Sequence, residues 1–135
     1  MFLLDTMVIS ALVKAPARQN AAIRAWLNAQ APSDLFLSVV AVAEINRGIV
    51  SQQKPQPAFA ARLERWLDQT IVEFGDRILP ISVKIARRWG ELSAAAGNRN
   101  HDLVVAATAL EHGLSVVTRN VAHFRPTGVA TVDPF

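Results

Sequence analysis

Short runs of apolar residues alternate along the chain with longer segments in which apolar residues recur at helical spacing. Each short run is bounded by polar or turn residues, a pattern typical of a strand that is buried on both faces of a sheet. These runs predict strands at Phe2–Leu4, Leu35–Leu37, Ile78–Ile81, Ser115–Thr118 and Val129–Val132. Because Pro80 lacks a backbone N–H, we expect the third run to lie at the edge of the sheet or to mark the end of a strand.

Helices are expected between these strands, where apolar side chains return every three or four residues. The pattern predicts helices over residues 6–13, 17–29, 39–50, 59–74, 83–96 and 101–112, with an exposed polar loop at 51–56. Strands that alternate with helices through short links form parallel sheets with helices on both faces. We therefore expect an α/β fold, a three-layer α/β/α sandwich with a central parallel sheet, formed by a single domain over residues 1–135.

The composition excludes several classes of protein. The chain is 51% hydrophobic and 19% charged, which is typical of a folded globular protein. Its apolar runs are shorter than the roughly 18 residues of a membrane span, and no basic segment precedes the apolar N-terminus. Cysteine is absent, so disulfides and thiolate metal sites are excluded. We expect a cytoplasmic protein that does not contact membranes. Its net charge of +3 permits a nucleic-acid partner and, equally, an acidic protein partner.

Two acidic residues stand where parallel sheets place functional groups, beyond the carboxyl ends of the strands. Asp5 directly follows the first predicted strand, although it would also serve as the cap of the helix that begins near Thr6. Glu44 lies on a helix that is otherwise apolar on several sides, and a surface pair with Arg47 is the alternative role. For either residue alone, the sequence leaves both roles open.

Asp102 opens the segment HDLVVAATAL, which is otherwise small and apolar. A helix cap is the simplest role for such an aspartate, but Asn98 or Asn100 could already cap this helix. Asp102 shares its helical face with Val105 and Ala109, small residues suited to close packing on a sheet. We therefore expect its carboxylate to point inward, toward the same end of the sheet as the other two acids.

Three carboxylates at one point require a neutralising partner. At a separation of about 5 Å, each pair repels by about 3 kcal/mol at an effective dielectric constant near 20. Protonation would remove this repulsion, and so would a hard divalent cation with oxygen ligands. No histidine is obvious in the cluster, and we expect His101, His112 and His123 to be surface or turn residues. Mg²⁺ or Mn²⁺ is therefore favoured over Zn²⁺, and phosphodiester hydrolysis is the reaction that suits such a site best.

A polar segment follows the fourth predicted strand and adds groups to the same rim. Thr118 and Asn120 could orient a water molecule bound to the metal ion, and Arg119 could contact a phosphate. An ordinary polar turn is the alternative for all three residues. The spacing of these residues does not distinguish a role at the metal site from an ordinary turn.

Four ordered segments resemble the PIN-domain ribonucleases, and within them the bacterial toxins of the VapC and FitB type. The segments are MFLLDTMVIS, SVVAVAEINRGI, HDLVVAATALEHGLSVVTRNVAHF and the final VDPF, so the resemblance covers essentially the whole chain. It implies that Asp5, Glu44 and Asp102 bind Mg²⁺ or Mn²⁺ in an endoribonuclease that cleaves RNA. It also implies that Thr6, Thr118 and Asn120 assist near the metal.

The resemblance also implies protein partners. The toxins that this chain resembles form homodimers. They also pair with a small antitoxin, and the two proteins together form a larger assembly. The C-terminal segment of the antitoxin covers the acidic pocket, and its N-terminal part binds operator DNA. We therefore expect this chain to meet operator DNA only through an antitoxin.

The chain departs from the family pattern at two places. Asn120 stands where many PIN proteins carry a fourth acid, which leaves the number of metal ions, one or two, open. The link Gly97–His101 is more polar than the proline-containing turn common in the family. A catalytically weak PIN-fold module that acts only through its partner is the alternative function. A phosphorylated receiver domain is a more distant one, because no lysine follows Lys84.

Overall fold

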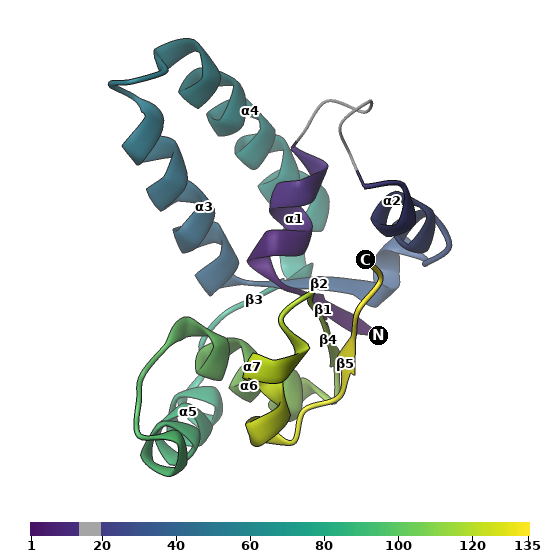
Figure 1. The fold of residues 1–135 in the computed structure, drawn as a ribbon, viewed down its shortest axis with the longest axis vertical. Helices are drawn as coiled ribbons and strands as arrows, with labels where there is room; N and C mark the ends of the chain where they lie inside the picture. Colours follow the sequence, from purple (N-terminus) through teal and green to yellow (C-terminus); the bar gives the residue numbers. More distant parts are fainter. Residues whose placement is uncertain (14–19) are drawn as a thin grey trace.

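The computed structural model describes residues 1–13 and 20–135, and its centre is a five-stranded sheet whose neighbouring strands are all parallel (Figure 1). The strands are β1 (Phe2–Leu4), β2 (Leu35–Ser38), β3 (Ile78–Leu79), β4 (Ser115–Val117) and β5 (Thr131–Val132). Their order across the sheet is β3-β2-β1-β4-β5, so the first strand of the chain is the central one.

Helices cover both faces of this sheet. They are α1 (Thr6–Leu12), α2 (Ala21–Asn28), α3 (Val39–Gln52), α4 (Pro57–Phe74), α5 (Val83–Ala96), α6 (His101–His112) and α7 (Val121–Phe124). Figure 1 shows α1 to α4 on one side of the sheet and α5 to α7 on the other, with α3 and α4 side by side and projecting away from the strands. The predicted α/β sandwich with a central parallel sheet is confirmed.

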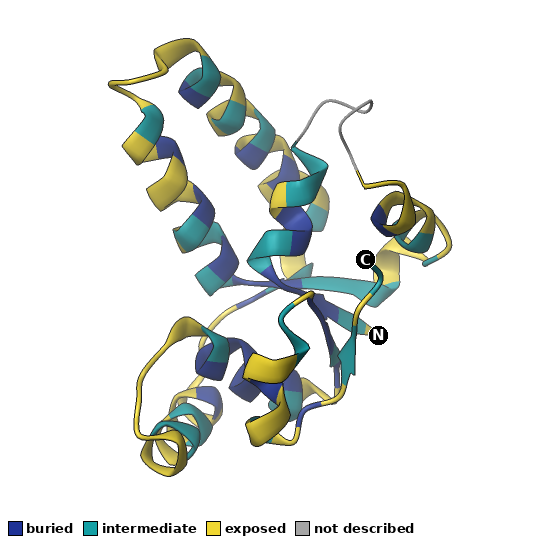
Figure 2. Ribbon diagram, viewed as in Figure 1, coloured by how far each residue is buried: buried dark blue, intermediate teal, exposed yellow. Residues whose placement is uncertain are grey.

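Alternation along the strands divides the core into two parts, because successive side chains point to opposite faces of a sheet. Leu4 and Val117 pack in the cluster formed with α1 to α4, whereas Leu3 and Val116 pack with α6 and α7 on the other face. Figure 2 shows the buried residues concentrated on the strands and on the helix sides that face them. Both faces of the short strands are therefore covered, as their continuous apolar sequence predicts.

Most predicted boundaries differ from the observed ones by one or two residues, and the larger differences have local causes. β3 does lie at an edge of the sheet, but it ends at Leu79 because Pro80 cannot donate to a strand ladder. The last strand begins only at Thr131, since the Val129 N–H donates to the Thr127 hydroxyl at 3.3 Å instead.

Two helices also differ from their predictions. The described part of the predicted helix 17–29 begins at Ala21, where the Asn20 side chain caps it, and residues 17–19 lie outside the described residues. The helix α7 is missed by the sequence pattern, because four residues are too few to show a period. The predicted loop at 51–56 is shorter, since α3 continues to Gln52.

None of the helices within residues 1–13 and 20–135 combines the length and the apolar character that a bilayer crossing requires.

Candidate active site

The candidate site lies where the order of the strands reverses. From β1 the chain adds β2 and β3 on one side, and then returns to place β4 and β5 on the other. Crevices form beyond the carboxyl ends of parallel strands at such a point. Asp5 directly follows β1 and Thr118 directly follows β4, and the backbone N–H of Asp5 donates to Val117 O at 3.0 Å. The sheet itself thus brings two segments that are far apart in the sequence to this edge.

Asp5 has two hydrogen-bond donors, one for each carboxylate oxygen. The Thr6 N–H donates to Oδ1 at 2.8 Å, and the Thr118 hydroxyl donates to Oδ2 at 2.7 Å. Asp5 is only 8% exposed, and Thr118 is fully buried behind it. The capping role considered for Asp5 is therefore observed, and it coexists with a position in the crevice.

Glu44 projects from α3 toward the start of α1. Its Oε2 accepts a hydrogen bond from the Thr6 hydroxyl, and its Oε1 lies 2.9 Å from Nδ1 of His101. Thr6 therefore contacts two acids, through its N–H and through its hydroxyl. These contacts take the place of the surface pair with Arg47 that the sequence left open.

Asp102 occupies the first turn of α6 but does not cap it. The cap is Asn100, whose side chain accepts from the Leu103 N–H at 3.2 Å. Asp102 Oδ2 instead lies 2.9 Å from Nδ1 of His123 in α7. Its helical neighbour Val105 is buried against the sheet, as the face pattern predicts.

All three histidines are surface residues as expected, but two of them contact acids of this cluster, which the sequence does not indicate. His101 and His123 are exposed, with side-chain exposures of 60% and 58%, yet each contacts one of the acids. The partners are 57 and 21 residues apart in sequence, so spacing gives no signal of either contact. The one signal available in the sequence is that His101 is the neighbour of Asp102 at the start of α6, which places it near the acids. His112 is exposed at the opposite end of that helix.

Most of the predicted site residues line one cavity of about 450 Å³. Its lining includes all three acids together with Thr6, Arg119 and Asn120. Thr118 lies behind Asp5, and its hydroxyl oxygen accepts from the Asn120 N–H at 3.0 Å. Arg119 lies over the ring of Phe135, which also lines the cavity, with 5.1 Å between the guanidinium carbon and the ring centre. We call this cavity the acidic pocket.

The electrostatics of the acidic pocket disfavour a bare carboxylate at its base. Burial is the largest influence and raises the pKa of Asp5 above its ordinary value of 3.8. The negative charges of Asp102 and Glu44 raise this pKa further, while the hydrogen bonds from Thr118 and Thr6 oppose the shift. A positive charge in the pocket would relieve both unfavourable effects.

The donors of the acidic pocket fit a hard divalent cation in kind, since Asp5, Glu44 and Asp102 offer carboxylate oxygens. As the side chains stand, no three acidic or histidine residues in the described part of the chain form a ready-made metal-binding group. Glu44 and Asp102 are instead held by His101 and His123.

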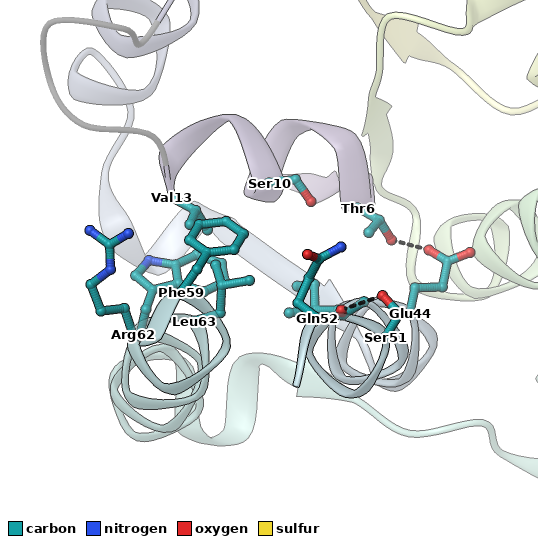
Figure 3. A pocket seen from close by; sticks show the side chains of 12 residues that line it. Thr6, Ser10, Val13, Glu44, Ser51, Gln52, Phe59, Arg62 and Leu63 are labelled. Atoms are coloured by element: carbon teal, nitrogen blue, oxygen red, sulfur yellow. Dashed lines mark hydrogen bonds between the residues drawn. The ribbon is translucent and has the colours of Figure 1, made fainter. Parts of the chain in front are cut away.

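A second and larger cavity of about 860 Å³ adjoins the acidic pocket, with which it shares Thr6, Ser10 and Glu44. It is a groove between α1, α3 and α4. Figure 3 shows Val13, Phe59 and Leu63 gathered at one end and the Thr6–Glu44 pair at the other. The sequence does not predict this groove, because its walls come together through the packing of α1 and α4 on α3.

Similar proteins are known by sequence. A sequence profile of the PIN domain family matches residues 2–127. The chain is 33% identical over 142 residues to VapC ribonuclease Y4jK of Sinorhizobium fredii, a match that covers 100% of this chain and 98% of the relative. It is 32% identical over 143 residues to toxin FitB of Neisseria gonorrhoeae, covering 100% and 99% of the two chains.

Solved structures are similar over the same length. The crystal structure of FitAcB from Neisseria gonorrhoeae matches with a TM-score of 0.86 and 31% identity, covering 99% of this chain and 98% of the other. The structure of FitAB bound to an IR36 DNA fragment matches with a TM-score of 0.83 and 30% identity, covering 99% and 95%.

Proposed function

This chain belongs to the PIN domain family, and from that premise we propose that it is a metal-dependent endoribonuclease that acts as the toxin of a toxin–antitoxin pair. The observation that carries the proposal is the acidic pocket, in which Asp5, Glu44 and Asp102 arrive from three separate segments. The names of two relatives, a VapC ribonuclease and the toxin FitB, support the same assignment. The whole chain, residues 1–135, would act as one nuclease domain in the cytoplasm.

In this proposal Asp5, Glu44 and Asp102 hold Mg²⁺ or Mn²⁺. A cation bound there supplies Lewis-acid polarisation of a phosphate oxygen and neutralises charge that develops during phosphodiester hydrolysis. Thr118 and Thr6 keep Asp5 oriented through the bonds to its two oxygens. The donors on Asp5 favour its charged form, which is the form that binds a cation.

Two rim residues would meet the RNA. Arg119 is exposed and held on the ring of Phe135, so its guanidinium can contact a phosphate beside the pocket. Asn120 lines the same pocket and presents an amide that can orient an attacking water. Because Asn120 is uncharged, the proposal assigns the metal ligands to the three acids only.

The partner in this proposal is a cognate antitoxin. The groove between α1, α3 and α4 leads from the apolar side chains Phe59 and Leu63 to Glu44 at the acidic pocket. An antitoxin segment with apolar side chains would bind there and cover the acids. A homodimer of the toxin would assemble with the antitoxin, and operator DNA would be contacted through the antitoxin alone.

Cleavage of RNA by the purified chain, freed from any bound partner, tests this function. We expect cleavage with Mg²⁺ or Mn²⁺, none with a chelator, and none from Asp5→Asn or Asp102→Asn at unchanged circular dichroism. Asp68→Asn is the matched control, because Asp68 is an exposed acid on α4 away from the pocket. Full activity of either pocket variant would remove that residue from the mechanism. A chain that binds its partner but never cleaves would instead be the alternative, a PIN-fold regulatory module.

A further inference from the structure

Two of the three acids in the acidic pocket are contacted by imidazole rings from different elements. His101, the first residue of α6, reaches Glu44 on α3, and His123 in α7 reaches Asp102 on α6. Both contacts are made through Nδ1, and both measure 2.9 Å. The two contacts are independent of each other, since they join different pairs of helices.

The chemistry of the partners sets the direction of these bonds. A carboxylate only accepts hydrogen bonds, so each Nδ1 must carry the hydrogen and donate it. The neutral imidazole with its hydrogen on Nδ1 is sufficient for this, and it leaves Nε2 without a hydrogen. Neither bond therefore depends on a charged histidine.

We propose that His101 and His123 are positioning residues that keep Glu44 and Asp102 at the acidic pocket, where these acids would bind the divalent cation. This inference rests on the proposed function and names part of its machinery that the three acids do not include. Ligands of a metal ion are commonly held by donors in the surrounding layer, and loss of such a donor weakens metal binding.

The pattern of contacts supports this role. On Glu44 the two oxygens are taken by different donors, Thr6 and His101, which fixes the plane of a side chain with three rotatable bonds. On Asp102 the His123 bond uses Oδ2, and Oδ1 has no hydrogen-bond partner among the described residues. The free Oδ1 is thus the atom that the inference assigns to the cation.

Asp5 provides the internal comparison. Its two oxygens are held by Thr6, the first residue of α1, and by Thr118, which directly follows β4. Glu44 and Asp102 lie on helices instead, at 30% and 27% side-chain exposure, where water competes for their oxygens. The histidines thus orient these two acids through hydrogen bonds, as the threonines orient Asp5.

Two other roles for the histidines make different predictions. If the rings were themselves ligands, two nitrogen donors would shift the preference of the site from Mg²⁺ toward Zn²⁺ or Co²⁺. If the rings held the acids away from the cation, removing either ring would tighten metal binding. The positioning role predicts weaker binding of every divalent cation alike.

The test is a titration of the full-length chain with Mn²⁺ and with Zn²⁺, followed by calorimetry, which needs no RNA and no turnover. We expect His101→Ala and His123→Ala to weaken Mn²⁺ binding about 10- to 100-fold. His101→Asn and His123→Asn should restore most of the affinity, because the asparagine amide N–H lies near the place of Nδ1. His112→Ala is the matched control on α6, and its affinity should equal that of the unaltered chain.

The outcomes separate this inference from the proposed function. Unchanged or tighter Mn²⁺ binding by both alanine variants would overturn the positioning role. A selective loss of Zn²⁺ affinity that asparagine does not restore would overturn it in favour of direct ligation. If Asp102→Asn abolishes Mn²⁺ binding while His123→Ala does not alter it, the inference fails and the proposed function stands. If the unaltered chain binds no divalent cation, the proposed function fails first.

Discussion

Removing the hydroxyl of Thr118 while keeping its shape, as Thr118→Val, isolates the support of a buried carboxylate. This hydroxyl donates to Asp5 Oδ2 at 2.7 Å, and Thr118 and Asp5 are 0% and 8% exposed. A hydrogen bond to a charged group is worth about 1.5–3 kcal/mol, and one between neutral groups about 0.5–1.5 kcal/mol. At neutral pH the variant should therefore lose about 1.5–3 kcal/mol of the free energy of unfolding, or about 5–11 °C in Tm for a chain of this length.

The dependence of this loss on pH identifies its cause. Burial and neighbouring charge already raise the pKa of Asp5 in the folded chain above 3.8, and removing the Thr118 bond raises it further. The folded state with ionised Asp5 is therefore less stable in the variant than in the unaltered chain. This difference exists only at pH values where Asp5 is ionised. The loss should be full above the raised folded pKa and should shrink as the pH falls through it toward 3.8.

Urea unfolding between pH 4 and pH 8 measures this dependence, and Thr108→Val is its matched control. Thr108 is equally buried, but its hydroxyl donates to the neutral Val104 O at 2.8 Å. We expect this control to lose about 0.5–1.5 kcal/mol at every pH. A loss in Thr118→Val that does not change with pH, or that equals the control at neutral pH, would refute the argument from the charge of Asp5.

Further predictions concern the cation, the core and the rim. Mn²⁺ at 100 times its Kd should raise the free energy of unfolding by about 2.7 kcal/mol, and Asp102→Asn should abolish this gain; thermal melts with and without Mn²⁺ measure both. Phe124→Ala, at a fully buried residue of α7, should cost about 3–5 kcal/mol in urea unfolding, and a cost below 1 kcal/mol would contradict the packing described. Arg119→Ala should raise the KM for RNA, and the slope of log affinity against log salt should fall in size by about 0.7–0.9; an unchanged slope would exclude a phosphate contact.

The sequence predicts the fold well because its signals are local. Each buried strand is a short apolar run, and helices such as 83–96 carry both a regular apolar spacing and a closing Gly97 in the left-handed conformation. The same holds for Asp5, whose place directly after β1 follows from the run that precedes it. The parallel direction of the strands also follows, because helices join them.

The rest of the site depends on contacts that the sequence does not encode locally. Thr6 and Glu44 are 38 residues apart, and only the packing of α1 on α3 makes their contact possible. His123 lies in a helix of four residues, too short for any periodic signal, so its contact with Asp102 could not be expected. For Asp5, capping a helix and lying in the crevice are not alternatives. One carboxylate oxygen accepts from the Thr6 N–H at the start of α1, and the other accepts from the Thr118 hydroxyl.

The pairing of β1 with β4 joins segments that are far apart in the chain, because the Thr118 hydroxyl that supports Asp5 lies 113 residues later. During synthesis Asp5 is therefore made long before the strand that completes the crevice. No incomplete translation product that stops before Thr118 can build the pocket. The groups that surround Asp5 can therefore come together only after β4 has been made.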